Sequence, residues 1–312
     1  MFASYKREHE WQIREFLFTL RLLARNPSAV AGCVIIATMV FIALSAPYIA
    51  PYDPIRISLS ERLSPPSTIH FFGTDEMGRD ILSRVMHGAR ISLRIGVLVI
   101  VIAGGLGALI GAVAGYQGKQ TDNIIMRVMD VILSFPPLVL AMAMAAALGP
   151  NLNNAIVAVA FVMIPKFARM VRGEALAVKE RQFIAAARAS GAGTLWIILH
   201  HILPNCFSSV IVLGTLILGE TILIAASLSF IGLGAQPPTP EWGAMISVGR
   251  KFLMEQWWYP TFPGLFILGG AWATTGESLS YPHDIARLGG GAGGHHLWHQ
   301  GAQHGNYHSL CH

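Results

Sequence analysis

Two ionisable side chains interrupt apolar runs in this sequence, and they are its strongest chemical signal. Glu220 lies inside a long apolar segment, where a carboxylate is costly unless it is paired, protonated or facing water. It is a candidate contact for a proton or a substrate on a path across a membrane. The alternative is a neutral acid bonded across a helix interface. Lys166 lies near the end of another apolar run, and we expect its ammonium group to reach the membrane surface rather than bind a ligand.

No arrangement typical of a catalytic site emerges from the residue types. Gly118-Lys119-Gln120 faintly resembles a nucleotide-binding loop, but Val113 replaces the leading glycine and Gln120 replaces the metal-binding Ser or Thr. The histidines that begin at His295 follow a glycine-rich string and lack the fixed spacing of a metal site. The three cysteines indicate neither a disulfide framework nor a zinc site. We therefore predict no enzyme activity, cofactor or metal, and any ATP must be bound by another chain.

The composition indicates a chain that is surrounded largely by lipid. Hydrophobic residues make up 53% and charged residues 12% of the sequence, whereas a soluble domain carries about 25% charged residues. A chain with so few charges cannot cover its own surface in water. The net charge of +5 could suggest nucleic acid, but the basic residues lie mainly beside apolar runs, as membrane topology requires. We predict an all-α, polytopic membrane protein without a nucleic-acid partner.

Apolar segments of about 20 residues, the length that crosses a bilayer core, predict the membrane spans. Five spans are well defined, and a sixth is short before polar residues intervene. In chain order they are Ala29–Ala50, Ile91–Tyr116, Val131–Leu148, Ala155–Arg169, Ser208–Leu233 and the short Tyr259–Ala273. Basic residues are more numerous on the side that is inside if the N-terminus is cytoplasmic, so we predict that orientation.

The spans divide the chain into three predicted parts. Residues 1–28 form a cytoplasmic N-terminal segment, and residues 29–273 form the transmembrane domain. Residues 274–312 form an atypical tail rich in Gly and His, which we expect to be disordered or the product of a shifted reading frame.

Small residues recur along one face of the second span. Ala103, Gly107, Gly111 and Gly115 are spaced by four and therefore lie above one another on a helix. Small side chains let a second helix approach closely, so we expect compact helix packing at this face.

The segment of residues 172–205, between the fourth and fifth spans, predicts a helix-turn-helix. Helix formers dominate Glu174–Ser190, with Phe183, Ile184 and Ala187 on one face. The apolar face indicates either a docking surface for a soluble partner or a helix that folds back onto the bundle.

The ends of this helix-turn-helix are predicted from its glycine and proline. Gly191 is suited to end the first helix, because glycine accepts the left-handed conformation common at that position. The second apolar stretch begins at Leu195 and is expected to stop at Pro204.

The same segment resembles the EAA loop of ABC-importer permeases. Phe183-Ile-Ala-Ala-Ala-Arg-Ala-Ser-Gly191 and His200-His-Ile-Leu-Pro-Asn205 carry the resemblance. It implies a loop whose helix sits in a groove of a separate ATPase subunit. The residues of this implied coupling loop are Phe183, Ile184, Ala185, Ala186, Ala187, Gly191, Leu203 and Pro204. Ala185 stands where the family often has glutamate, which weakens any argument for a salt bridge there.

Other segments resemble the C-type subunit of dipeptide, oligopeptide and nickel permeases. The first predicted outer loop carries Phe72-Gly-Thr-Asp-Glu-Met-Gly-Arg-Asp-Ile-Leu-Ser-Arg84. Its motif residues are Gly73, Thr74, Asp75, Gly78, Arg79 and Asp80. Further matches are Leu22–Pro27, Ala46–Pro54, Asp130–Pro137, Leu228–Gly243 and Trp257–Gly264. The resemblance covers roughly residues 15–268, and the sequence departs from the family pattern after Leu268.

The resemblance implies a six-span importer subunit in the bacterial plasma (inner) membrane. Such a subunit pairs with a B-type permease subunit and two ATPase subunits, and receives cargo from an extracytoplasmic substrate-binding protein. It forms half of a translocation path for peptides or related small solutes. A rival hypothesis is a self-contained proton-coupled carrier or channel that uses Glu220, and ATP dependence distinguishes the two. The sequence does not predict which solute is carried.

Overall fold

The computed structural model describes the backbone of residues 27–289, together with the side chains of residue 27 and residues 30–273. Contacts divide the chain into two compact units. The larger unit is Val34–Thr274. The smaller unit combines residues 1–33 with residues 275–312, and the described part of it consists of two helix ends.

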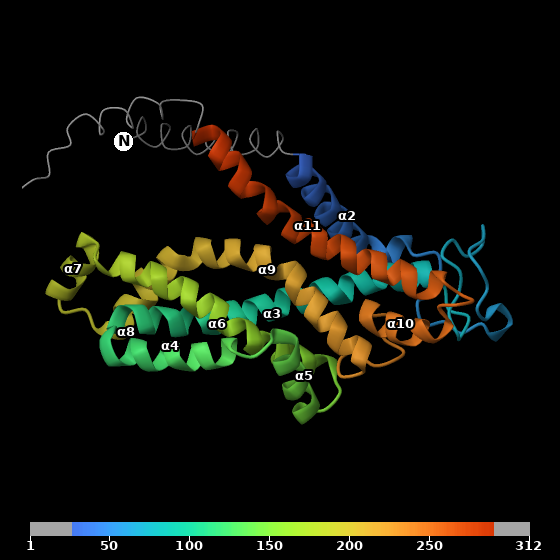
Figure 1. Ribbon diagram of the computed structural model, residues 1–312, viewed down its shortest axis with the longest axis horizontal. Coiled ribbons are helices and arrows are strands. Elements are labelled where there is room, and N and C mark those ends of the chain that lie inside the picture. Colours follow the sequence, from blue (N-terminus) through green and yellow to red (C-terminus); the bar gives the residue numbers. More distant parts are fainter. Residues whose placement is uncertain (1–26, 290–312) are drawn as a thin grey trace, which may run out of the picture. The chain divides into compact units, whose positions relative to one another are not determined.

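The regular structure of the described residues is helical throughout (Figure 1). The helices are α2 (Pro27–Ile49), α3 (Ile81–Gln117), α4 (Lys119–Leu133), α5 (Pro137–Leu148), α6 (Leu152–Lys179), α7 (Gln182–Ala189), α8 (Thr194–Ile197), α9 (Leu203–Ile231), α10 (Trp242–Gly249) and α11 (Trp258–Gly289). Short 3-10 segments cover Leu59–Glu61 and Arg250–Phe252, and a π-helical turn, Ile198–Ile202, joins α8 to α9. Among the described residues, four helical segments are long and apolar enough to cross a membrane, or up to five if one bent pair counts as a span. The predicted all-α polytopic class is confirmed.

The third predicted span, Val131–Leu148, is wrong as a single straight helix. The chain forms α4 and α5, which meet at an angle of 91°. Pro136 and Pro137 lie at the break, and Pro137 begins α5. Proline disfavours helical geometry in the residue before it and lacks an N–H, so two prolines in a row end one helix and start another.

The predicted small-residue face of the second span is confirmed as a close helix contact. A Cβ atom added at Gly107 would lie 2.6 Å from the Cβ of Phe167, and one at Gly111 would lie 2.3 Å from the carbonyl oxygen of Ala168. A Cβ at Gly115 would lie 2.8 Å from the carbonyl oxygen of Arg172. Only glycine permits this approach, which sets α6 directly against α3 and so fixes the position of the charged residues that α6 carries.

The last helix is longer than the predicted sixth span. The sequence suggests an end near Ala273, but the backbone continues as helix to Gly289. The predicted span ends where polar residues follow Ala273, and polar residues do not by themselves end a helix. Among the described residues α11 is not one of the segments that meet the length and hydropathy of a span. The sixth span therefore stays a prediction, and the histidine-rich residues of the tail lie outside the described range.

Helix α3 connects two regions of different character within the larger unit. Its 37 residues correspond to about 55 Å at 1.5 Å per residue, more than the ~30 Å core of a bilayer. The segment of residues 51–80, here called the 51–80 loop, precedes α3. The last turn of α3 lies beside α7 (Figure 1). Because α3 crosses the membrane once, the 51–80 loop and α7 lie on opposite sides.

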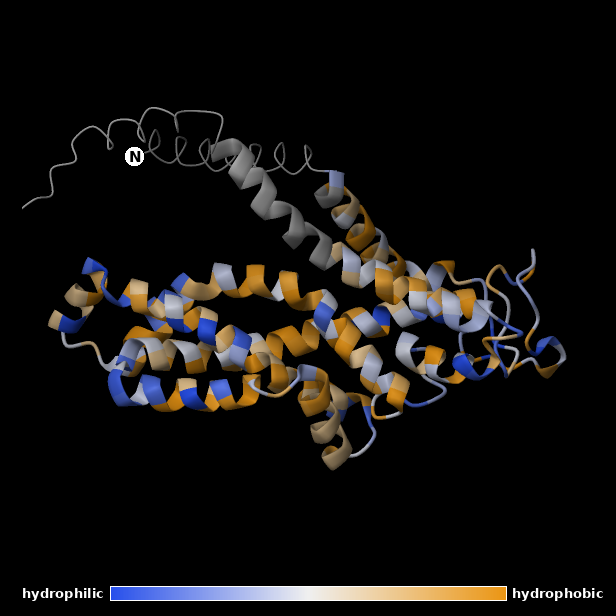
Figure 2. Ribbon diagram, in the orientation of Figure 1, coloured by the Kyte–Doolittle hydropathy of each residue, from blue (hydrophilic) through white to orange (hydrophobic). Residues whose placement is uncertain are grey.

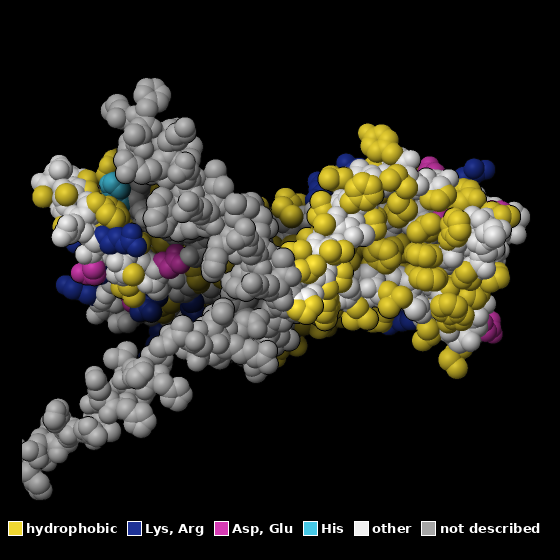
Figure 3. All heavy atoms as spheres, turned by 90° about the horizontal axis from the view of Figure 1, so that it is seen from above, with side chains coloured by type: hydrophobic (Ala, Val, Ile, Leu, Met, Phe, Trp, Pro, Cys, Tyr) yellow, Lys and Arg dark blue, Asp and Glu magenta, His cyan; other side chains and the backbone are white. Residues whose placement is uncertain are grey.

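Side-chain chemistry follows the same division. Figure 2 shows mostly hydrophobic residues along α2, α5 and α9, and polar residues on α4, around α7 and in the 51–80 loop. In the view of Figure 3, hydrophobic side chains cover a broad face on the right, and the visible Lys, Arg, Asp and Glu side chains lie along its edges and at the far left. This distribution is expected for a bundle whose middle contacts lipid.

Candidate functional site: coupling segment, polar loop and intramembrane ion pairs

Helix α7 is separated from α6 by a sharp turn. The predicted continuous helix over Glu174–Ser190 is wrong, because α6 ends at Lys179 and α7 begins at Gln182. Arg181 between them has extended backbone angles, φ −74° and ψ 147°. Helix propensity alone does not predict this break, which arises because the turn lets Ile184 reach a buried apolar cluster.

One fully buried side chain of α7 packs into the rest of the unit. Ile184 is fully buried in a cluster that includes Ile197, Ile198 and Ile202. Phe183 is 40% exposed, so the predicted shared apolar face is divided between core and surface. Ala185 and Ala186 are exposed and Ala187 is half-buried. Most of α7 is therefore free to contact another molecule.

Gly191 ends α7 as the sequence predicts. Its φ is +82°, the amide of Ala192 donates to the carbonyl of Ala187, and the amide of Gly191 donates to that of Arg188, each at 3.0 Å. These two bonds define a Schellman motif, which satisfies carbonyls that a helix end would leave free. No atom lies within 4 Å of a Cβ placed on Gly191, so backbone conformation rather than space selects glycine here.

Pro204 does not stop the helix that follows, contrary to the expectation from sequence. It lies in the first turn of α9, and the helical path is continuous from Thr194 to Ile231. The π-helical turn Ile198–Ile202 precedes it, and there the Leu203 amide donates to the carbonyl of Ile198, five residues earlier. Leu203 is half-buried and packs against the apolar cluster that contains Ile184, whereas Pro204 is exposed.

A shallow pocket lies against α7. The residues that line it come from α7, its C-terminal turn and the following segment: Phe183, Ala186, Ala187, Ser190, Gly191, Ala192, Gly193, Trp196 and His201. Trp196 stacks on His200 at a ring-centroid distance of 4.8 Å and is itself 46% exposed. An exposed apolar pocket beside a short helix is suited to receive a protein surface.

A polar contact links α7 to the end of α3. The Arg188 guanidinium lies over the Tyr116 ring at 4.9 Å, and its Nε donates to the Tyr116 hydroxyl at 3.1 Å. Helix α7 therefore contacts both the apolar cluster and the last turn of α3.

The motif residues of the 51–80 loop form a buried, closely packed cluster rather than an open site. Gly78 has φ +71°, and an added Cβ would lie 1.8 Å from the carbonyl oxygen of Ser58. Gly73 has φ +75°, with 2.7 Å from an added Cβ to the Ser64 carbonyl oxygen. Thr74 is fully buried and its hydroxyl donates to the Glu61 carbonyl. These positions require glycine or a small polar side chain because backbone segments cross closely.

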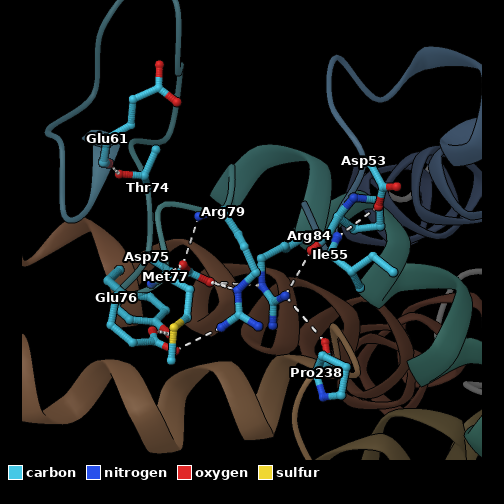
Figure 4. Close-up of polar contacts among 12 residues, drawn as sticks. Asp53, Ile55, Glu61, Thr74, Asp75, Glu76, Met77, Arg79, Arg84 and Pro238 are labelled. Atoms are coloured by element: carbon cyan, nitrogen blue, oxygen red, sulfur yellow. Dashed lines mark hydrogen bonds and ion pairs between the residues drawn. The ribbon is translucent and has the colours of Figure 1, made fainter. Parts of the chain in front are cut away.

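Asp75 lies at the centre of this buried cluster (Figure 4). Its carboxylate accepts hydrogen bonds from the Arg79 Nε at 2.6 Å and from the backbone amides of Met77 and Arg79 at 2.8 and 2.9 Å. The Arg84 Nε lies 3.4 Å away. Both arginines are more than nine-tenths buried. Charges buried this deeply persist only when they are paired, so the network holds the loop in one conformation.

Other contacts tie this loop to the helices. Asp80 caps α3 by accepting from the amide and hydroxyl of Ser83, each at 2.7 Å, and lies 2.9 Å from the Nδ1 of His70. The Tyr259 hydroxyl on α11 donates to Glu76. Neither His70 nor Tyr259 is signalled by the sequence, because each partner is distant along the chain.

Glu220 does not stand alone at membrane depth, because Lys166 is its partner. The Lys166 Nζ lies 2.6 Å from Oε1 and 2.5 Å from Oε2 of Glu220. The expectation that Lys166 extends to the membrane surface is therefore wrong. The aliphatic stem of lysine is long enough to cross from α6 to α9. The nearby carboxylate stabilises the ammonium group more than the distant membrane surface would.

Two further ion pairs continue along α6 at intervals of three residues. Arg169 donates to Asp130 of α4 at 2.5 Å. Arg172 holds Asp122 of α4 with two bonds, at 2.5 and 2.6 Å. Basic residues at every third position of an apolar helix were a signal for this row that the sequence analysis did not use. The three pairs tie α6 to α4 and α9.

Among the described residues, no group of three His, Cys, Asp or Glu side chains is placed to hold a metal ion. Gly118 and Lys119 form the tight turn between α3 and α4, with φ of +65° and +49°.

Comparison with known proteins identifies the family. The family model for "Binding-protein-dependent transport system inner membrane component" matches residues 107–274, and the model for "N-terminal TM domain of oligopeptide transport permease C" matches residues 18–66. A protein of Escherichia coli (strain K12) described as "Probable D,D-dipeptide transport system permease protein DdpC" is 48% identical over 247 residues, 79% of this chain and 83% of that protein.

Two further relatives agree. The dipeptide transport system permease protein of Alkalihalophilus pseudofirmus is 44% identical over 79% of this chain and 81% of its own length. The di/tripeptide transport system permease protein of Pseudomonas aeruginosa is 43% identical over 78% of this chain and 83% of its own length. The matched residues include α7, the intramembrane ion pairs and the helices that carry them. This chain therefore belongs to the family of binding-protein-dependent transport system inner membrane components, which are multi-pass permeases.

Proposed function

We propose that this chain is one permease subunit of an ATP-driven importer of short peptides. The α7 region carries the proposal, because a short helix with one fully buried residue and a mostly exposed surface is suited to dock into a soluble partner. The partner is a separate ATPase subunit, and the residues that contact or position it are Phe183, Ile184, Ala185, Ala186, Ala187, Gly191, Leu203 and Pro204. Relatives whose names specify dipeptides and tripeptides support short peptides as cargo.

Coupling follows from the mechanical continuity of α7 with the spans. The hydrogen bonds of α7 are internal, so the helix moves as a rigid body. Ile184 transmits its displacement to the start of α9, and Arg188 transmits it to the end of α3. Closure of an ATPase pair would thus shift α9 and α3 together and change which side of the bundle is open.

The 51–80 loop is the proposed contact for an extracytoplasmic substrate-binding protein. It lies on the opposite side of the membrane from α7, so α7 and the N-terminus are cytoplasmic. Its rigid centre carries apolar side chains on the outside, including Ile57 at 59% and Leu59 at 69% exposed. Exposed apolar side chains on a rigid polar frame favour transient docking of another protein. A B-type permease subunit completes the translocation path in this proposal.

The decisive experiment is affinity purification of the intact chain from its own membranes in mild detergent, followed by mass spectrometry. Wild-type protein is expected to bring a second permease and two ATPase subunits. Phe183→Ala should lose the ATPases but keep the second permease. Phe207→Ala changes a more exposed phenylalanine on α9 (63% against 40% for Phe183) and serves as the control.

Recovery of the chain alone, together with solute uptake that persists without ATP, would contradict the importer. That result would favour a self-contained carrier that uses Glu220.

A further inference from the structure

The pair of Lys166 and Glu220 lies about midway along the two helices that carry it. Lys166 is in the central part of α6 and Glu220 is in the second half of α9, and both helices are candidate spans. The ammonium group contacts both carboxylate oxygens, so the pair is neutral as a unit. Charged groups at this depth are rare in membrane proteins and mark substrate or ion pathways.

The pair is not enclosed by its own chain. The side chain of Lys166 is 29% exposed and that of Glu220 is 36% exposed. Hydrocarbon cannot solvate charges, so this surface faces either water or another protein and not lipid.

Exposed positions flank the pair on both helices. On α6, Arg169 is half exposed, and one turn further no atom lies within 4 Å of a Cβ placed on Gly173. On α9, Leu216 and Leu223 lie one turn to either side of Glu220 and are 40% and 45% exposed. A neutral pair of charges bordered by apolar side chains matches a ligand that carries both charges and apolar groups.

We propose that Lys166 and Glu220 bind the two charged ends of a short peptide as it crosses the membrane, an inference that rests on the function proposed above. A dipeptide carries an ammonium group and a carboxylate that lie at most about 7 Å apart. Glu220 would accept from the ammonium group and Lys166 would donate to the carboxylate. The internal ion pair opens and two new pairs replace it, so no charge is left unpaired at this depth.

The third ion pair of α6 provides a matched control within the same chain. Arg172 holds Asp122 through two parallel bonds, and the Asp122 side chain is only 11% exposed. A planar guanidinium fixed in this way is suited to join helices rather than to exchange partners. The control pair therefore stabilises the fold without selecting cargo.

The test uses the whole complex, with its second permease, ATPases and binding protein, reconstituted in liposomes. ATP-dependent uptake is measured for two dipeptides, one amidated at its C-terminus and one acetylated at its N-terminus. Lys166→Met and Glu220→Gln are compared with wild type. Because the same binding protein delivers each dipeptide to every variant, its own selectivity cancels in the ratio between variants.

The ratio of amidated to acetylated dipeptide uptake should shift in opposite directions in the two variants. Lys166→Met keeps the carboxylate and should favour the amidated peptide, and Glu220→Gln should favour the acetylated one. Each shift should be about tenfold, the size of one charge-assisted hydrogen bond. An equal fall for both peptides would overturn the proposal, because a purely structural pair affects all cargo alike.

A double variant keeps the test valid if a single variant fails to assemble. Lys166→Met/Glu220→Gln removes both charges and leaves none unpaired, as does the control Arg172→Met/Asp122→Asn. The first should assemble and hydrolyse ATP but take up the unmodified dipeptide at least about tenfold more slowly, whereas the control should keep uptake. Unchanged uptake in the first double variant would overturn the proposal. Absence of ATP-dependent uptake in wild type would instead count against the proposed function.

Discussion

The 51–80 loop and the α7 region lie at opposite ends of α3 and are built in opposite ways. The loop buries its charges: Asp75, Arg79 and Arg84 are all more than nine-tenths buried, and both arginines form ion pairs with Asp75. The α7 region exposes its apolar residues, with Leu195 64% and Trp196 46% exposed. Each region reverses the usual distribution of polar residues outside and apolar residues inside.

The difference shows how sequence motifs of similar clarity serve different purposes. In the loop, motif residues face inward and hold a shape, so the surface offered to a partner is made by other residues. In α7, most motif residues face outward, and one of them, Ile184, is buried and packs the helix against the apolar cluster. Motif residues therefore indicate function directly at α7 and only indirectly in the 51–80 loop.

The largest expected effect is in the loop. Asp75→Ala removes the shared acceptor of two buried arginines, and the free energy of unfolding should fall by about 3–5 kcal/mol, as expected for a broken buried ion pair. Thermal unfolding of the purified protein in detergent measures this change. Asp53→Asn, which alters an exposed carboxylate bonded only to the Ile55 amide, is the control and should change little. Equal loss in both variants would contradict the buried network.

The anchoring of α7 predicts a separation between stability and assembly. Ile184→Ala removes a fully buried side chain and should lower the free energy of unfolding by about 2–4 kcal/mol through the cavity it leaves. Phe183→Ala should change that free energy by less than about 0.5 kcal/mol, as at most exposed positions, while ATPase recovery falls. If Phe183→Ala lowered stability as much as Ile184→Ala, the division of α7 into anchor and docking surface would be wrong.

Two glycines with positive φ sharpen the same contrast. Gly78→Ala combines an unfavourable backbone conformation with a collision against Ser58 and should cost about 3 kcal/mol. Gly191→Ala meets open space and should cost about 1 kcal/mol from conformation alone. Gly191→Asn, which tolerates the left-handed region, should cost less still. Comparison of unfolding midpoints tests this order, and a larger loss at Gly191 than at Gly78 would refute it.

The smallest effect concerns Glu241, which caps α10 and is 1% exposed. Burial raises the pKa of this carboxyl above its ordinary value. The folded state therefore holds the proton more tightly than the unfolded state, and proton binding adds to the free energy of unfolding. This contribution is fully present below the unfolded-state pKa and is lost as the pH rises through the folded-state pKa. Wild type should gain stability relative to Glu241→Gln when pH is lowered from 7 to 4. Exposed Glu255→Gln should show no such trend, and a trend of opposite sign would contradict a raised pKa.

Most of the helices, the small-residue contact and the αL end of α7 could be predicted from the sequence, because periodicity, hydropathy and glycine act locally. The break at Pro136-Pro137 is also encoded locally. A prediction that uses only the length of the apolar run misses it, because the run continues through both prolines. The turn at Arg181 and the pairing of Lys166 with Glu220 could not be predicted in this way. They depend on residues far apart in the chain, which the fold brings together.

The most direct test of the account is site-specific photo-cross-linking in intact membranes, with p-benzoylphenylalanine placed at Phe183 or at Ile57. Both positions are exposed, and they lie in the two contrasted regions. The account predicts an adduct with the ATPase subunit from position 183 only, and an adduct with the extracytoplasmic binding protein from position 57 only. An ATPase adduct from position 57, or none from position 183, would contradict it.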